Sequence, residues 1–247
     1  MTLDSYIHSL HGKSIAVIGL GVSNRPLLRL LLDAGYAVTV RDKRPREAFG
    51  EDEAAALEAA GCRLVLGEDY LAGITEDVIF RTPGLHPFTP ELAAAKARGA
   101  LLTSEMEAFF AVCPCRIIAV TGSDGKTTTT TIISELLKAQ GYRVFLGGNI
   151  STPLLDKAPE MTPDDWAVLE LSSFQLHSMN CQPDIAVVTN VSPNHLDVHP
   201  SYEDYQIAKK QIFLSQGSAG VTVLNADNAI TRVFAEDCPG EVRFFSR

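Results

Sequence analysis

The sequence predicts an α/β protein built on mostly parallel sheets. Short apolar runs rich in Val and Ile alternate with amphipathic helical stretches along all 247 residues, and strands that alternate with helices pair in parallel through βαβ crossovers. Hydrophobic residues make up 46% of the chain and charged residues 21%, which is the composition of a globular protein with a sizeable core. The length suits one large domain or two small ones.

The first predicted unit covers residues 1–111. Its strands are the apolar runs SIAVIGL, YAVTVRD, CRLVLG and DVIFRTPG, in that order. Between and after these runs, the residue pattern predicts helices at 25–34, 54–60 and 104–111. Strands and helices that follow one another in this way form a Rossmann-like succession, so we expect a Rossmann-like N-terminal domain.

The second predicted unit covers residues 112–247 and begins where Cys113-Pro114-Cys115 breaks the helical pattern. Its strands are RIIAVTG, YRVFLG, WAVLEL, DIAVVTN and AGVTVLN, and its helices lie at 127–139 and 203–214. The final run, EVRFFSR, predicts one more strand with no helix behind it. We therefore expect the second sheet to be incomplete and the chain to be part of a longer protein.

The charge balance and the cysteines narrow the class of protein. Thirty acidic residues against 21 basic ones give a net charge of −9, which disfavours binding to nucleic acid or to an anionic membrane surface. The N-terminus has no signal-peptide pattern and no apolar run is long enough to span a bilayer, so we expect a cytoplasmic protein. The five cysteines are odd in number, and the Cys113-Pro114-Cys115 spacing is shorter than in most zinc or redox motifs. The sequence therefore predicts reduced, inert core thiols.

A glycine-rich segment between a predicted strand and a predicted helix has the residues of a phosphate-binding loop. Backbone N–H groups at such a junction face a bound phosphate, and the positive end of the helix attracts it. Val120 stands where the standard P-loop pattern has its first glycine, and the extra glycine is Gly122. We expect a P-loop ATPase-type α/β domain in which Lys126 reaches the β- and γ-phosphates and Thr127 binds Mg²⁺. The predicted nucleotide-binding residues are Gly122, Ser123, Asp124, Gly125, Lys126, Thr127 and Thr128.

The helix after this loop begins with a run of five threonines. Threonine is β-branched and favours strands. We therefore expect packing to sustain the helix, through Ile132, Ile133, Leu136 and Leu137.

Polar residues end two further strands of the second unit. Glu170 ends one strand, and Thr189-Asn190 ends another, before a loop that contains His195 and Asp197. Ligands of open parallel sheets bind beyond the carboxyl ends of the strands, so these groups should meet near the phosphate loop. A carboxylate, an imidazole and a threonine hydroxyl beside phosphates make a plausible Mg²⁺ site, although a solvated strand end and a loop histidine would look the same in the sequence.

Lys209 lies on the predicted inner face of the helix at 203–214. Tyr205, Ala208, Lys209 and Ile212 follow the i, i+3, i+4, i+7 spacing, whereas Lys210 is rotated by about 100°. A lysine on a buried face either extends its ammonium to solvent or is a desolvated amine with a lowered pKa. Such an amine could be modified or could pair with the metal site.

The first unit carries a weaker glycine motif after its first strand. Gly19 and Gly21 precede Asp42 at nearly the spacing of a dinucleotide fingerprint, but Asn24 stands where the third glycine belongs. The motif supports phosphate binding without deciding between NAD(P) and another nucleotide. Lys43 and Arg44 could contact an anionic ligand or be solvated, and the turn Thr82-Pro83-Gly84 should open on the same side.

Four segments of the second unit, TGSDGKTT, LELSSFQL, NVSPNHLD and YQIAKKQIF, follow the N-terminal GLGVS loop in an order that resembles the Mur ligases. The resemblance covers essentially the whole chain and implies an ATP-dependent amide ligase of peptidoglycan synthesis. It is greatest to the members that join D-glutamate to UDP-N-acetylmuramoyl-L-alanine. In that reaction the γ-phosphate of ATP passes to the alanyl carboxylate, and the D-glutamate amine attacks the acyl phosphate. We expect a monomer.

The resemblance also implies roles for individual residues. Lys126, Glu170, His195 and Lys209 would be catalytic, and Lys209 would carry a carbamate that holds a second Mg²⁺. The implied metal-binding residues are Thr127, Glu170, His195 and carbamylated Lys209. The implied UDP-sugar contacts are Leu20, Gly21, Val22, Ser23, Asp42, Lys43, Arg44, Thr82, Pro83, Gly84, Asn149, Ser172 and Gln175.

The sequence departs from the family at several positions. Asp124, Ser151, Asn194 and Val198 replace residues that are usual in the family, which puts nucleotide affinity in question but removes no catalytic group. The family's third, C-terminal domain, which binds the amino acid, has no counterpart in the chain, so we expect binding without turnover. Another Mur-type ligase, an NAD(P)-dependent oxidoreductase and a non-catalytic nucleotide-binding module are the alternatives.

Overall fold

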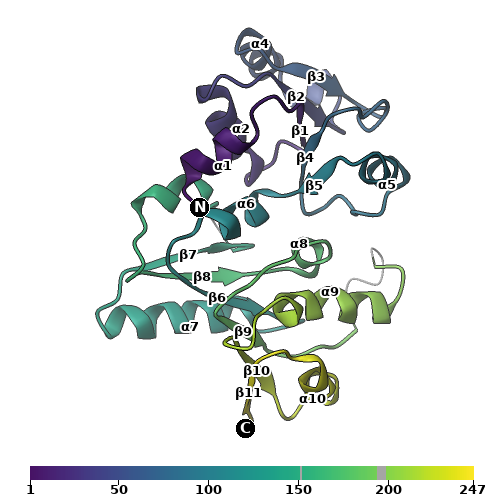
Figure 1. Cartoon of the computed structure of the whole chain (residues 1–247). Helices are drawn as coiled ribbons and strands as arrows, with labels where there is room; N and C mark the ends of the chain where they lie inside the picture. The colour runs from purple at the N-terminus through teal and green to yellow at the C-terminus, as the bar shows by residue number, and fades with distance from the viewer. Residues whose placement is uncertain (151, 194–198) are drawn as a thin grey trace. The chain divides into compact units, whose positions relative to one another are not determined.

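The computed structural model describes residues 1–150, 152–193 and 199–247. Two compact units divide the chain (Figure 1). The first unit consists of residues 1–112 together with 155–159, and the second consists of residues 113–154 and 160–247. Each unit contains its own parallel sheet, which confirms the predicted α/β class with a Rossmann-like first unit.

The first unit has a five-stranded parallel sheet in the order β3-β2-β1-β4-β5. β1, at the centre, is buried along its whole length because both faces of the sheet are covered. The chain order reverses between β1 and β4, and such a switch point creates a crevice at the carboxyl ends of the two strands. The strands are β1 Ile15–Ile18, β2 Val38–Asp42, β3 Arg63–Leu66, β4 Val78–Arg81 and β5 Leu101–Thr103.

The helices of the first unit connect these strands. Leu27, Leu28 and Leu31 form the buried stripe of α2. Thr2 caps α1 by accepting a hydrogen bond from the Ser5 amide. The helices are α1 Leu3–Ser9, α2 Asn24–Asp33, α3 Arg46–Phe49, α4 Glu51–Ala59, α5 Pro90–Ala97 and α6 Glu105–Val112.

The second unit has a six-stranded parallel sheet in the order β11-β10-β9-β6-β8-β7. β6 lies between β8 and β9, so the chain order reverses around it and the crevice of this sheet lies at its carboxyl end. The strands are β6 Arg116–Thr121, β7 Val144–Gly148, β8 Trp166–Glu170, β9 Ile185–Val188, β10 Val221–Asn225 and β11 Glu241–Phe245.

Helix α7 runs along the half of this sheet that contains β6, β8 and β7, while α8 lies beside α9 (Figure 1). Ser201 caps α9 by accepting from the Asp204 amide. The α-helices are α7 Lys126–Ala139, α8 Ser173–Leu176, α9 Tyr202–Leu214 and α10 Ala229–Phe234, and a 3₁₀ helix, η2, covers Ala235–Asp237. Another 3₁₀ helix, η1 Leu155–Glu160, belongs to the first unit up to Pro159.

The expected packing of α7 is only half correct. Ile133 and Leu137 pack against the sheet, but Ile132 and Leu136 are 53% and 66% exposed. Adjacent helix positions differ by about 100° in direction, so four residues at i, i+1, i+4 and i+5 do not share one narrow face. The remaining buried residues of α7 are the small side chains Thr130 and Ser134, which let the helix approach the sheet.

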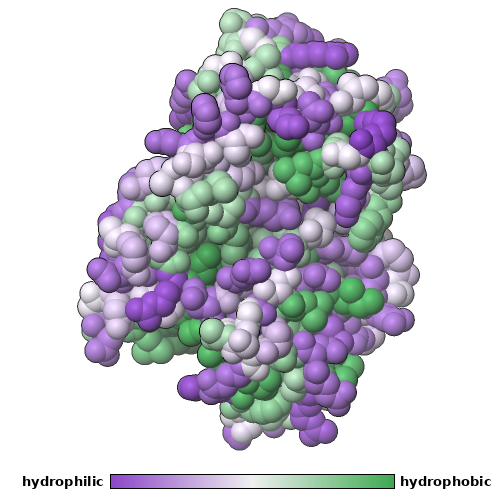
Figure 2. Space-filling view, in the orientation of Figure 1, coloured by the Kyte–Doolittle hydropathy of each residue, from purple (hydrophilic) through white to green (hydrophobic). Residues whose placement is uncertain are grey.

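The surface of the units is mixed in polarity. Figure 2 shows hydrophilic residues interspersed with smaller groups of hydrophobic ones on the face in view. Among the described helices, none is both long enough and apolar enough to cross a membrane.

Candidate functional site

The predicted phosphate loop follows β6 at the switch point of the second sheet. Gly122 has φ +151°, and a side chain there would overlap the Thr189 hydroxyl. Gly125 has φ +76° and forms the N-cap of α7, a left-handed conformation that glycine adopts at little cost. The backbone thus requires glycine at these two positions, for different reasons.

The end of β9 holds the loop in place. The Asn190 side chain accepts a hydrogen bond from the Asp124 amide and donates one to the Asp124 carbonyl, both at 3.0 Å. The Thr189 hydroxyl donates to the same carbonyl at 2.7 Å. The Ser123 amide donates to the Asn190 carbonyl at 2.9 Å. The loop backbone is therefore held at Ser123 and Asp124, while the Asp124 side chain stays exposed.

The loop presents one cation and two hydroxyls at the start of α7. The Lys126 ammonium donates to the Ser123 carbonyl at 3.0 Å and so folds back over the loop. Thr127 and Thr128 are exposed in the first turn of the helix, where the positive end of the helix attracts anions. This arrangement suits the β- and γ-phosphates of a nucleotide.

Glu170 ends β8 beside this turn. Its carboxylate is 2% exposed and accepts hydrogen bonds from the Thr127 hydroxyl at 2.7 Å and from the Asn149 amide at 3.0 Å. Both donors are neutral, so these hydrogen bonds do not balance the negative charge of the carboxylate. A bound cation would balance it. Carboxylate and hydroxyl oxygens are the donors that Mg²⁺ prefers. The residues present therefore fit a magnesium ion.

The Lys209 side chain is buried beneath the loop, as the helical spacing predicted. It is 1% exposed, its ammonium donates to the Gly122 carbonyl at 2.8 Å, and it lies 4.5 Å from the centre of the Tyr205 ring. Burial, and next the positive charge of Lys126, lower the pKa of Lys209 to about 7. Lys210, one residue on, instead contacts Asp237 near the surface. A fraction of the Lys209 amine is therefore neutral and nucleophilic near pH 7.

Tyr205 joins α9 to the phosphate loop by a second route. Its hydroxyl lies 3.0 Å from the Ser123 hydroxyl, which in turn donates to the Ser192 carbonyl at 3.0 Å. The Ser192 amide donates back to the Ser123 hydroxyl at 2.9 Å. The helical spacing predicted Tyr205 on the inner helix face, but it could not reveal this contact because the partner is 82 residues away.

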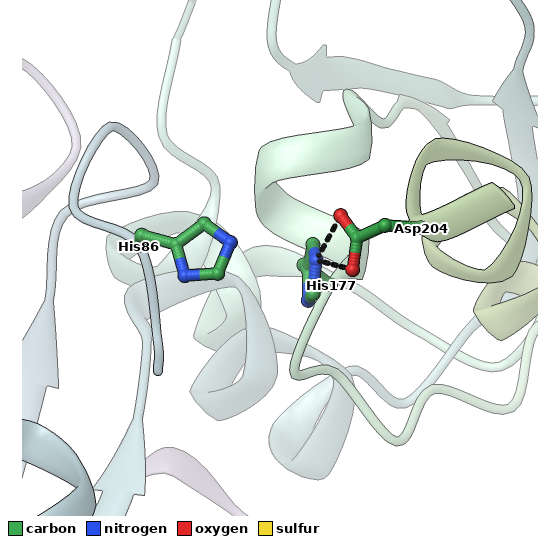
Figure 3. Close-up of side chains that lie close together, drawn as sticks. All are labelled: His86, His177 and Asp204. Carbon is green, nitrogen blue, oxygen red and sulfur yellow. Dashed lines mark hydrogen bonds and ion pairs between the residues drawn. The ribbon is translucent and has the colours of Figure 1, made fainter. Parts of the chain in front are cut away.

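Asp204, in the first turn of α9, binds two histidines. His177 Nε2 lies 3.0 and 2.9 Å from the two carboxylate oxygens (Figure 3), and His199 Nδ1 lies 2.7 Å from one of them. The other nitrogen of His199 lies 2.9 Å from the Ser173 hydroxyl. Burial opposes ionisation of Asp204, but the hydrogen bonds from His199 and His177 lower its pKa below the usual value. His86, also drawn in Figure 3, belongs to the first unit.

Three other predicted residues of the second unit lie in specific local structures. Ser172 and Gln175 form a capping box at the start of α8, in which each side chain accepts from the backbone amide of the other residue. Asn149 follows β7, and both its backbone amide and its side chain donate to Glu170. His195 lies outside the described residues.

A cavity of about 520 Å³ adjoins the phosphate loop. Its walls carry amide side chains that can donate and accept hydrogen bonds. Apart from Asp124 and Asn190, these residues were not predicted from the sequence; Asn225, a polar residue at the end of β10, was the available signal. The lining residues are Asp124, Asn190, Ser192, Asn225, Asp227, Asn228 and Arg247.

The first unit has a separate cavity of about 350 Å³ at its own switch point. Most of the predicted contacts line it, but Val22, Ser23 and Pro83 do not, and Val22 is exposed at the surface. Tyr70 and Leu85 were not predicted. The lining residues are Ile18, Gly19, Leu20, Gly21, Asp42, Lys43, Arg44, Tyr70, Thr82, Gly84 and Leu85.

Asp42 at this cavity is already engaged by protein groups. It accepts from the Leu20 amide at 2.9 Å and, through both carboxylate oxygens, from the Arg44 guanidinium at 2.9 and 2.8 Å. Burial opposes ionisation, yet the hydrogen bonds from Arg44 and Leu20 lower the pKa of Asp42. A fingerprint carboxylate binds the ribose of NAD, whereas this one is neutralised by Arg44. The arrangement therefore differs from the free carboxylate that binds the ribose of NAD.

Two buried polar residues shape the same cavity. Asn24, in place of the third fingerprint glycine, donates to the Ile18 and Gly19 carbonyls and holds the end of β1. Arg81 donates to the carbonyls of Thr82, Pro83 and Leu85 and so fixes the turn after β4.

The fold and the two cavities define an α/β protein with a phosphate loop and a second, separate cavity on a Rossmann-like unit. Residues 120–246, just over half of the chain, match the Mur ligase middle domain. The chain belongs to the Mur ligase family.

Similar proteins cover almost the whole chain. The UDP-N-acetylmuramoylalanine--D-glutamate ligase of Clostridium kluyveri is 48% identical over 98% of the chain and 53% of its own length. The ligase of the same name from Acetivibrio thermocellus is 50% identical over 99% of the chain and 53% of its own length. The chain thus spans about half the length of these curated relatives.

A solved structure shares the fold. The UDP-N-acetylmuramate:L-alanyl-gamma-D-glutamyl-meso-diaminopimelate ligase from Neisseria meningitides has a TM-score of 0.58 and 19% identity. The match covers 94% of this chain and 78% of that one. It supports the arrangement of strands and helices described above.

Proposed function

We propose that the chain belongs to an ATP-dependent ligase that joins D-glutamate to UDP-N-acetylmuramoyl-L-alanine through an acyl phosphate. The observation that carries the proposal is the junction of β6 and α7, where Lys126, Thr127, Glu170 and Lys209 surround one phosphate loop. Relatives of about 50% identity that carry the corresponding name support the choice of substrates. The proposal includes a cytoplasmic location and a monomeric state.

The second unit would bind and orient ATP. The loop from Gly122 to Thr128 would surround the phosphates, with Lys126 directed at the β- and γ-oxygens. The neighbouring cavity around Asn225 and Asn228 would take the base, whose hydrogen-bonding edge suits amide side chains. Thr127 and Glu170 would hold Mg²⁺, which neutralises phosphate charge when it is bound.

Lys209 would act as a carbamate. Its neutral amine adds to CO₂ and releases a proton, which converts a buried cation into an anionic ligand for a second Mg²⁺. Burial against the Gly122 carbonyl keeps this group beside the phosphates. Lys209→Ala should therefore reduce activity far more than Lys210→Ala. An unmodified ammonium at Lys209 in a crystal grown with bicarbonate and Mg²⁺ would contradict the carbamate.

The first unit would bind the UDP-sugar. Lys43 and Arg44 line its cavity and can pair with a diphosphate, and the loop Leu20 to Ser23 and the turn Thr82 to Gly84 flank them. Asn149, Ser172 and Gln175 are proposed sugar contacts of the second unit. Calorimetric titration should show binding of UDP-N-acetylmuramoyl-L-alanine, and a preference for NADH would contradict this assignment.

The phosphate loop is tested by Lys126→Ala in the full-length enzyme. Without a charge on the β- and γ-oxygens, D-glutamate-dependent phosphate release should fall by at least about a hundredfold. Binding of the UDP-sugar should remain. Lys138→Ala, at the exposed end of the same helix beside Glu135, is the matched control. A Lys126→Ala enzyme with a nearly wild-type rate would show that the loop is structural.

A further inference from the structure

Three sulfur atoms gather at the base of β6, away from the phosphate loop. The Cys113 and Cys115 Sγ atoms lie 3.3 Å apart, and the Met161 Sδ lies 3.9 Å from the Cys115 Sγ. Cys115 and Met161 are 7% and 6% exposed, while Cys113 is partly open to solvent. Cys113 and Cys115 share the short segment before β6, and Met161 follows η1, so the fold brings the thioether to the thiol pair.

The distances favour a bound ion over a disulfide. Three sulfurs at about 2.3 Å from one ion lie about 4.0 Å from one another in a trigonal arrangement. The contact between Cys115 and Met161 already has nearly this length, and the two cysteine sulfurs, 3.3 Å apart, need to separate by only about 0.7 Å. A disulfide would require them to approach by about 1.2 Å.

The local charges favour a cation. The hydrogen bond between the two thiols lowers the pKa of Cys115 and, together with burial, raises the pKa of Cys113. The negative charges of Asp184 and Asp165 raise the pKa values of Cys113 and Cys115, respectively. The same carboxylates attract a positive ion to the pair of thiols.

We propose that Cys113, Cys115 and Met161 form a binding site for a soft monovalent d¹⁰ cation, namely Cu(I). Two thiolates and a thioether are soft donors that favour this ion over Mg²⁺, and three donors are fewer than the four that structural Zn²⁺ sites use. Binding forms three metal–sulfur bonds, releases the two thiol protons to solvent and changes no oxidation state. The bound ion links the segment before β6 to the loop after η1, and so holds the strand that leads into the phosphate loop.

Competition for Cu(I) tests the site. The purified, reduced protein is titrated under anaerobic conditions against a chromophoric Cu(I) chelator. We expect one Cu(I) per chain, at least a hundredfold weaker binding in Cys113→Ser and Cys115→Ser, and roughly tenfold weaker binding in Met161→Leu. The matched controls are Cys238→Ser, a partly exposed thiol far along the chain, and Met179→Leu, a buried methionine; both should bind as the wild type does.

Labelling of the wild type gives a readout that needs no variant. Cu(I) should slow alkylation of Cys113 by iodoacetamide and leave that of Cys238 unchanged, as followed by peptide mass spectrometry. The absence of a tight 1:1 complex, or a complex that survives both cysteine substitutions, overturns the proposal. Wild-type affinity in Met161→Leu overturns the three-sulfur site. A Cys113–Cys115 disulfide that forms in preference to the Cu(I) complex also overturns the proposal.

Discussion

Gly122 shows how one residue can determine the shape of the phosphate loop. Its positive φ and its close approach to Thr189 exclude every side chain, even a methyl group. The glycine therefore lets the end of β9 reach the loop backbone. The hydrogen bonds of Thr189 and Asn190 to Asp124 depend on this approach.

Gly122→Ala should destabilise the protein by roughly 3 kcal/mol or more, because the new methyl group must displace Thr189 as well as adopt an unfavourable backbone angle. Gly141→Ala is the control. Gly141 also has a positive φ, of +96°, but a side chain there meets nothing within 4 Å, so about 1–2 kcal/mol is expected. Urea unfolding measures both. Equal losses would mean that the contact with Thr189 relaxes freely.

Lys209 should make stability depend on pH in the absence of Mg²⁺ and bicarbonate. Its pKa falls from 10.5 to about 7 on folding, so between these values the unfolded chain binds a proton that the folded protein does not. Raising the pH through this window therefore stabilises the wild type, by about 1.4 kcal/mol per pH unit at most. Lys209→Met has no amine at this position, so its stability does not rise in this way with pH.

The measurement is urea unfolding of wild type and Lys209→Met at pH 7.5 and 9.5. The stability of the variant relative to the wild type should decrease by about 2–3 kcal/mol over those two units. Lys210→Met, which removes the surface lysine beside Asp237, controls for the loss of any lysine. The same decrease in both variants would argue against a desolvated amine at Lys209.

At the scale of the element, α9 connects the residues of the candidate site. Its first turn contains Asp204, its second contains Tyr205 and Lys209 lies one turn further along the same face. Asp204 binds the helix to α8 through His177, and Tyr205 and Lys209 bind it to the loop. The position of the first turn of α9 therefore affects where Lys209 lies.

Asp204→Asn should weaken this connection. The amide lacks the charge that accepts from both His177 and His199, and hydrogen bonds to a charged group contribute about 1.5–3 kcal/mol. We expect a loss of that size in urea unfolding and faster hydrogen exchange of the α9 amides. Glu203→Gln, an exposed acid in the same turn, should change stability by less than about 0.5 kcal/mol. Exchange rates in α9 that do not change would contradict the role of Asp204.

At the scale of the whole molecule, the sequence was most informative where a pattern is local. Apolar runs located strands such as β6 and β8, polar residues at strand ends located Glu170, and helical spacing predicted the burial of Lys209. Each of these signals depends on residues within a few positions of one another. The family resemblance also rests on such contiguous segments.

The remaining features depend on partners that are distant in sequence. Short helices such as α3 and α8, of four residues each, are too short to show periodicity. Tertiary packing sets the donation of Asn149 to Glu170, which are 21 residues apart, and the contact of His177 with Asp204, which are 27 residues apart. The sequence also gave no sign that residues 155–159 belong to the first unit.

Because each of the two units has its own core, we expect two unfolding transitions. Leu31 in α2 and Leu169 in β8 are both 0% exposed, each in the core of a different unit. Leu31→Ala and Leu169→Ala should each cost about 3–5 kcal/mol. Each substitution should shift a different transition in differential scanning calorimetry, because each unit buries its own core. A single transition that both substitutions lower equally would show that the chain unfolds as one unit.

The segment 155–159 determines when the core of the first unit can be completed during synthesis. The first unit extends to Val112, yet it also contains Leu155, which is 0% exposed and whose amide donates to Glu105 at 3.2 Å. A ribosome that adds about 5–20 residues per second needs roughly 2–9 s to pass from Val112 to Pro159. Throughout that interval the nascent first unit lacks one of its core side chains. The first unit therefore completes its core only after the phosphate loop and the first two strands of the second sheet have been synthesised.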